Sequence, residues 1–159
     1  MASAFLTKEV VERALGMIKP GIEALIKSEK KVVLYLVVLD PAESKAGAKT
    51  VLWEGAIGDS DRKKWPRDYC HFAHSKAELT LRTGLPAHLV LRNAPHLYRE
   101  GDFKFGGSDI RNGIIVAASG LDWYLDLMIS GAIAAMCHGF VIGLSEKEYA
   151  KDTHFIGET

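Results

Sequence analysis

The chain has 159 residues, which is the size of one domain and is enough to bury a core without disulfides or a structural metal. Twenty Lys and Arg side chains balance twenty Asp and Glu side chains, which argues against a non-specific electrostatic grip on nucleic acid or on an anionic membrane. We therefore predict a single domain over residues 1–159 with a small molecule or another protein as its partner.

The sequence lacks the patterns of export and of membrane insertion. Its first residues, MASAFLTKEVVERAL, soon become charged and amphipathic, without a signal-peptide core. No segment has roughly 20 uninterrupted apolar residues. Cys70 and Cys137 lack a metal or redox spacing, so we interpret both as buried reduced thiols. We expect a cytoplasmic protein with no nucleic acid and no membrane as partner.

The first half of the chain predicts one helix and a strand pair. Thr7 is a suitable N-cap, and Pro20 should kink or break the helix that follows it. Residues 32–39, VVLYLVVL, form an apolar run typical of a central strand covered on both faces. Residues 42–49 then indicate a hairpin loop that leads to a second strand over 50–57.

The middle of the chain predicts two helices and a second strand pair. Pro66 suits the first turn of a helix that Gly84 would end with a left-handed cap. A short helix should run from Pro86 through about Asn93. Strands are expected over 103–110 and 114–119, joined by the hairpin signal Asn112-Gly113.

The last third predicts a helix over residues 123–138 that is apolar nearly all round and stops at Gly139. Ser145 and Glu148 match a capping box for a further short helix. Together the elements indicate an α+β fold, with a mostly antiparallel sheet of about five strands packed with helices. One face of this apolar helix can pack on the sheet, but its other face has no cover within a single domain. We therefore also expect a homo-oligomer that buries Met128, Ile129 or Ala132.

Lys76 falls on the apolar side of the helix that precedes Gly84. At 100° per residue, Phe72, Ala73, Ala77, Leu79 and Leu81 share its arc, whereas the polar residues lie opposite. A lysine aimed into an apolar layer loses solvation unless a carboxylate, a carbonyl or a bound anion compensates. The position is therefore paired structurally, snorkels to water, or serves as a site.

A series of short motifs resembles the GlcG/HbpS-like family in order and spacing. The series spans residues 38–41 (VLDP), 73–77 (AHSKA), Gly84 with Pro86, 105–107 (FGG), 113–116 (GIIV), Ser119-Gly120 and Asp126. The resemblance covers most of residues 32–136. It implies a profilin-like α+β fold, a homo-oligomer, and binding of haem or another small ligand by some members.

Three polar residues on one helix could bind a metal ion. His71, His74 and Glu78 are spaced i, i+3 and i+7, which places them on one helical face. An exposed, solvated face has the same pattern, so we assign no metal site. A haem iron requires only one axial ligand, for which His71 or His74 is our choice and His96 the alternative.

The segment Phe105-Gly106-Gly107 has two small residues and free backbone donors beside a strand end, which suits the approach of a ligand or a tight turn. We interpret Asp122 and Asp126 as the start of a helix. Aromatic side chains that flank the expected cleft suit a flat ligand whose carboxylate Lys76 would bind: Trp53, Trp65, Phe103, Phe105, Trp123 and Tyr124.

Two functions remain open from the sequence. The first is binding of haem or a related tetrapyrrole through His71, His74, Phe105, Gly106 and Gly107. The second is a cofactor-independent isomerase, tautomerase or lyase that acts on a small organic or aromatic acid. In that enzyme Lys76 would be the catalytic residue, as an anion anchor or as a base with a depressed pKa.

Overall fold

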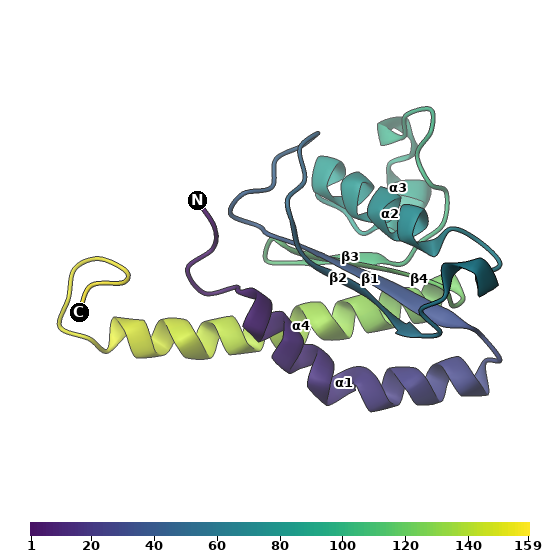
Figure 1. Cartoon of the computed structure of the whole chain (residues 1–159). Coiled ribbons are helices and arrows are strands. Elements are labelled where there is room, and N and C mark those ends of the chain that lie inside the picture. Colours follow the sequence, from purple (N-terminus) through teal and green to yellow (C-terminus); the bar gives the residue numbers. More distant parts are fainter.

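The computed structural model describes all residues 1–159 and has three layers (Figure 1). A four-stranded sheet of order β2-β1-β4-β3, antiparallel throughout, carries α1 and α4 on one face and α2 with α3 on the other. The predicted α+β fold with an antiparallel sheet is confirmed, with four strands in place of about five. The third predicted strand is shorter than expected, because residues 103–107 form a loop.

The elements follow one another in the predicted order. Their bounds are α1 Lys8–Ser28, β1 Val33–Leu39, β2 Val51–Gly58, the 3₁₀ turn η1 Arg62–Lys64, α2 Tyr69–Thr83, α3 Ala87–Asn93, the 3₁₀ turn η2 Pro95–Leu97, β3 Ser108–Arg111, β4 Ile114–Ser119 and α4 Trp123–Tyr149.

Strand β1 is buried along its whole length, as its apolar run predicted. Its side chains alternate between the two faces of the sheet, as in any strand. Leu34, Leu36 and Val38 join the larger core with α1 and α4, whereas Tyr35 and Val37 join the core under α2. The sheet therefore separates two hydrophobic cores, one on each of its faces, and contributes side chains to both.

Helix α1 confirms the predicted N-cap, because the Thr7 hydroxyl accepts a hydrogen bond from the Val10 N–H. The helix is continuous through Pro20, and Figure 1 shows that its axis bends along its length. A proline inside a helix removes one backbone hydrogen bond and crowds the preceding turn. The predicted perturbation is therefore a bend, and the helix does not break.

Helix α2 starts later than Pro66 and ends where the sequence predicted. Asp68 caps its N-terminus by accepting from the His71 N–H, and Gly84 ends it in the left-handed region with φ 71°. Its apolar arc packs on β1 and β4. This packing carries Lys76 into the interior of the molecule.

Helix α4 is longer than predicted, since one continuous helix includes both Gly139 and the expected second helix. The predicted stop at Gly139 is wrong: that glycine does not adopt a positive φ, and an internal glycine costs a helix only about 1 kcal/mol. The predicted capping role of Ser145 is also wrong, because its hydroxyl donates to the Ile142 carbonyl within the helix.

One side of α4 packs on the sheet through Ile129, Ile133 and Cys137, whereas Met128 is exposed. Ile129 is therefore not part of an uncovered face, contrary to our expectation. Figure 1 shows the C-terminal half of α4 extending past the sheet. By length and hydropathy α4 would also satisfy the requirements of a membrane span, a test that core helices of folded domains pass as well.

Candidate functional site

Lys76 forms a buried ion pair with Asp126 that joins the two helical layers. Its ammonium donates to the Ala118 carbonyl of β4 at 2.8 Å and lies 3.3 Å from the Asp126 Oδ2 on α4. The two side chains are 3% and 2% exposed, so Lys76 does not snorkel to water. Asp126 also accepts from the Leu121 N–H at 3.0 Å. The pair therefore connects α2, the end of β4 and the first turn of α4.

Burial shifts both partners of this pair toward their neutral forms. Desolvation lowers the pKa of Lys76, although the attraction of Asp126 opposes the change. Desolvation likewise raises the pKa of Asp126 to about 6, against the pull of Lys76 and of the Leu121 N–H. In low-dielectric surroundings, the cost of removing a charge from water exceeds the stabilisation that a single ion-pair partner provides. Burial therefore brings the pKa values of the two partners closer together than they are in water.

Gly107 leaves the space that the ion pair occupies. Its φ is 133°, and a Cβ atom there would lie 2.7 Å from the Lys76 Nζ and 2.8 Å from the Ala118 carbonyl oxygen. Its carbonyl accepts hydrogen bonds from the Ala118 N–H and from the Ser130 hydroxyl, at 3.0 and 2.7 Å. Position 107 therefore requires glycine both for its backbone conformation and for the close approach of Lys76.

A cavity of about 390 Å³ opens beside the ion pair, and Lys76 and Asp126 both line it. Its wall includes five aromatic rings and a second cation, namely Tyr69, Phe72, Phe103, Phe105, Trp123 and Arg67. The rings of Phe72 and Phe103 stack with centroids 4.4 Å apart, and the Lys76 ammonium lies 5.3 Å from the Phe103 centroid. An apolar slot with a cation at its inner wall is typical of a small-ligand site.

The structure brings together some of the predicted site residues. Lys76 and Phe105 line the cavity, and Gly107 adjoins Lys76. Gly106 packs closely against Trp123 and His88. His71 and His74 do not line the cavity: His71 is exposed, and His74 faces Glu54 of β2 at 3.3 Å.

The His71, His74 and Glu78 triad does not converge on one point. Glu78 pairs instead with Lys49, while His74 pairs with Glu54. Among the aromatic residues expected at the cleft, Phe103, Phe105 and Trp123 line the cavity, whereas the remaining ones lie elsewhere: Trp53 against the larger core, Trp65 beside Tyr35, and Tyr124 on the surface.

Sequence reasoning missed the role of Asp126, which we interpreted as part of a helix start. Asp126 does lie in the first turn of α4, but its side chain turns inward to Lys76. Tyr69 and Phe72 were also missed as wall residues. Tyr69 and Phe72 precede Lys76 by seven and four residues, so all three lie on one face of the helix. This spacing was the available signal that both rings lie beside the lysine.

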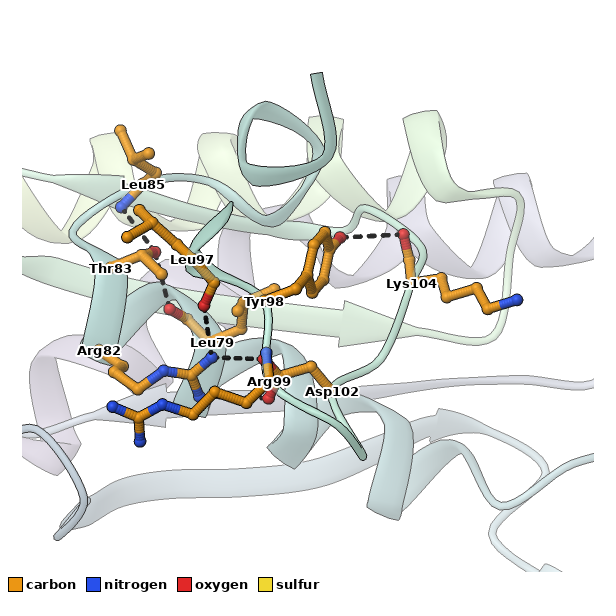
Figure 2. Close-up of polar contacts among 9 residues, drawn as sticks. All are labelled: Leu79, Arg82, Thr83, Leu85, Leu97, Tyr98, Arg99, Asp102 and Lys104. Carbon is orange, nitrogen blue, oxygen red and sulfur yellow. Dashed lines mark hydrogen bonds and ion pairs between the residues drawn. The ribbon is translucent and has the colours of Figure 1, made fainter. Parts of the chain in front are cut away.

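A larger, polar hollow of about 460 Å³ lies at the other end of α2. Most of its charges have partners within the protein. Lys49 pairs with Glu78, and Arg82 binds Asp102 through two guanidinium nitrogens (Figure 2). Arg82 also donates to the Leu97 carbonyl at 3.3 Å. These contacts fix the loop after α3, so we interpret this region as structural support for the cavity.

We predict that Asp102→Asn increases the mobility of the loop over residues 95–107, which carries part of the cavity wall, without unfolding the protein. Asp102 accepts from Arg82 and from the Arg99 N–H (Figure 2), just before Phe103 and Phe105 of the cavity wall. Losing a charge-assisted contact should cost about 1–3 kcal/mol. Urea unfolding measures that cost, and hydrogen exchange should increase selectively over residues 95–107. Unchanged exchange in this loop would contradict the role we give Asp102.

The raised pKa of Asp126 predicts a pH-dependent stability. The folded protein holds this proton more tightly than the unfolded chain, so the contribution favours folding below pH 4 and is lost as the pH rises through 6. A difference of about two pKa units corresponds to about 3 kcal/mol. Between pH 4 and pH 6, the parent should lose stability relative to Asp126→Asn in urea unfolding. Parallel stability profiles would contradict this assignment.

The fold is an α+β fold in which helices cover both faces of an antiparallel sheet, and solved structures share it. The crystal structure of Klebsiella pneumoniae protein ORFY, with family model DUF336, has a TM-score of 0.52 at 14% identity over 79% of this chain and 88% of that chain. The crystal structure of Ybr137w protein has a TM-score of 0.56 at 15% identity over 84% of this chain and 79% of that one.

No protein-family model matches this chain, and no curated protein matches it. The two solved structures therefore carry the comparison, and at 14% and 15% identity their likeness is one of fold. DUF336 is the family model of the GlcG-like proteins. The resemblance that the sequence motifs indicated is confirmed at the level of the fold.

Proposed function

We propose that this protein binds a planar small molecule with a carboxylate group in the aromatic cavity. The observation that carries the proposal is the Lys76 ammonium at the inner wall. An ammonium has three N–H donors, and the protein accepts two of them, through Ala118 and Asp126. The third N–H is available to a ligand. Stacked rings such as Phe72 and Phe103 would contact the flat part of that ligand.

Arg67 supports the same assignment from the rim of the cavity. Its side chain is exposed, and no carboxylate lies within ion-pairing distance of its guanidinium. Lys76 is largely neutralised by Asp126, so Arg67 would supply the free positive charge that attracts an anion. A ligand with its carboxylate between these two cations would have both charge and hydrogen bonds satisfied.

Haem fits this cavity less well than a smaller aromatic acid. The rings and the two cations would suit a macrocycle and its propionates, but an axial ligand to iron is also needed. His71 and His74 lie outside the cavity, which leaves the Tyr69 hydroxyl as the wall group of a type that binds haem iron. We therefore place an aromatic carboxylic acid ahead of haem as the ligand.

Displacement of a fluorescent probe tests the proposal. Anilinonaphthalene sulfonate carries a flat naphthalene ring and an anionic group, and we expect saturable binding to the full chain that naphthoate displaces and naphthalene methanol does not. Arg67→Gln should weaken naphthoate binding about tenfold, whereas the control Lys63→Gln, which removes another exposed and unpaired charge, should not. Equal displacement by the acid and the alcohol would overturn the proposal.

A second experiment adds haemin to the full chain and follows the Soret absorbance band. A saturable Soret shift at equal stoichiometry that is lost in His71→Ala or His74→Ala would favour the haem hypothesis over ours. A shift that survives both changes and is lost in Tyr69→Phe would place haem in this cavity.

A second candidate function is proton transfer on the bound acid. It rests on the contact between Lys76 and Asp126 at the cavity wall and on the directions of their pKa shifts, because burial lowers the pKa of Lys76 and raises that of Asp126, which favours proton transfer by such a pair. Phenylpyruvate is a suitable probe, since its enol loses the oxygen-bound proton and gains a proton at C3 to form the ketone. Catalysis should disappear in Asp126→Asn. A rate equal to that in buffer would refute this second candidate.

We also propose that the protein is a homo-oligomer. Apolar side chains remain uncovered along one side of α4, among them Met128, Ile142 and Tyr149. A second copy could bury them in a symmetric helix contact. Light scattering at micromolar concentration should give a mass above 17.4 kDa, and Ile142→Lys should reduce it. A monomeric mass for the parent would refute the proposal.

A further inference from the structure

We propose that Glu54, Cys70 and His74 form a binding site for Zn²⁺ or a similar divalent transition metal. The three residues lie where the N-terminal half of α2 reaches Glu54 of β2, through the contact of His74 with that carboxylate. None of them lines the aromatic cavity, so this site is independent of the proposed function. From the sequence we assigned no metal site and interpreted Cys70 as a buried thiol, whereas Cys70 is only half-buried.

The geometry of the three donor atoms carries the proposal. The Cys70 thiol, the His74 ring and the Glu54 carboxylate have ligand atoms within 4.8 Å of one another. Neighbouring ligands in a tetrahedral zinc site are about 3.3–3.8 Å apart, given metal–ligand distances of about 2.0–2.3 Å. The His74 Nε2 already lies 3.3 Å from the Glu54 carboxylate. The Cys70 sulfur lies within 4.8 Å of both other donor atoms, which is at most about 1 Å more than the spacing of neighbouring ligands in such a site.

Secondary structure fixes the positions from which these side chains converge. Cys70 and His74 are one helical turn apart, at i and i+4, so both face the same side of α2. Glu54 lies opposite Val37 in the β1–β2 register. Val37 belongs to the core under α2, so Glu54 points to the same face of the sheet.

Tyr35 orients the carboxylate and leaves one oxygen free. The Tyr35 hydroxyl donates to the Glu54 Oε1 at 2.6 Å, which leaves Oε2 for a metal ion. Ligating carboxylates in proteins are commonly held by such an outer hydrogen bond.

The chemistry of the donor set indicates the kind of metal. A thiolate, an imidazole and a carboxylate together suit Zn²⁺ or Co²⁺, whereas Mg²⁺ and Ca²⁺ select oxygen ligands. Glu54 is exposed and the other two are half-buried, so water can occupy a fourth position. Arg62 lies near, with its guanidinium carbon 5.7 Å from the Tyr35 ring centre. The thiolate and carboxylate carry two negative charges and outweigh it.

Cobalt titration of the untagged chain tests this site in the reduced protein. We expect Co²⁺ to produce a thiolate-to-cobalt charge-transfer band that saturates at one metal per chain and that Zn²⁺ abolishes. Cys70→Ser should remove the band. His74→Ala and Glu54→Gln should each weaken Co²⁺ binding at least tenfold. Cys137→Ala is the matched thiol control, since Cys137 is fully buried, and it should leave the band unchanged.

His71→Ala is the matched imidazole control, because His71 is exposed on the same helix and lies outside the cluster. It should bind Co²⁺ like the parent. Protection of Cys70 from iodoacetamide by Zn²⁺, read by peptide mass spectrometry, is a second measurement on the parent protein that requires no variant to fold. Absence of the band, its persistence in Cys70→Ser, or equal losses in His71→Ala and His74→Ala would overturn the proposal and leave an ion pair only.

Discussion

Lys76→Met should lower the free energy of unfolding by about 3–5 kcal/mol at pH 8, because it leaves the Asp126 carboxylate buried without its partner. Both side chains are almost fully buried, at 3% and 2% exposed. Methionine preserves most of the packing of the lysine stem, so the loss reports on charge. Urea unfolding followed by circular dichroism measures it. The loss should shrink at pH 5, where the Asp126 carboxyl, with its pKa raised by burial to about 6, is protonated.

The double variant Lys76→Met with Asp126→Asn separates structure from function. Asparagine can still accept from the Leu121 N–H and carries no charge, so most of the lost stability should return. Naphthoate binding should not return, since the ammonium that holds the carboxylate is missing. A double variant that regains both stability and naphthoate binding would show that Lys76 has a structural role alone. A single variant as stable as the parent would contradict the ion pair itself.

Gly107→Ala should strongly destabilise the protein at the Lys76–Asp126 ion pair beside the aromatic cavity. A methyl group at this position meets the Lys76 Nζ, the Ala118 oxygen and the Asp126 Cβ, at 2.7, 2.8 and 2.9 Å. Two of these three atoms are held by the backbone or by buried packing, so they cannot move aside freely. Overpacking of this kind typically costs about 1–3 kcal/mol beyond any backbone strain.

Gly101→Ala provides the matched control for backbone strain. Its φ of 93° is also positive, but nothing lies within 4 Å of the added methyl group. We expect about 1–2 kcal/mol for the left-handed backbone alone, and a clearly larger loss for Gly107→Ala in the same urea experiment. Naphthoate affinity should fall in Gly107→Ala only. Equal losses of stability in both variants would mean that Lys76 and Asp126 reposition without cost.

The local elements of this fold could be predicted from the sequence, because their causes lie within a few residues. The Thr7 cap and the Gly84 cap depend on one side chain and on one backbone conformation, respectively. The continuous apolar run of β1 indicated burial on both faces. The position of Lys76 on the apolar arc of α2 indicated a site that needed compensation, and Lys76 is indeed buried.

The extent of α4 could not be predicted, because two helix-stop signals competed with propagation. Gly139 and Ser145 suit helix ends, yet either is tolerated inside a helix at a modest cost. Packing of Ile129 and Ile133 on the sheet stabilises the first half of α4. The helix then continues past both signals to Tyr149.

The sequence by itself determined the class of fold, the caps at Thr7 and Gly84 and the presence of one lysine in an apolar layer, all of which follow from local periodicity and conformation. Only the tertiary structure decided the partners. Asp126 is 50 residues from Lys76, and Glu54 is 20 residues from His74. Sequence spacing gives no measure of such contacts, because they depend on how α2 and α4 pack on the two faces of the sheet.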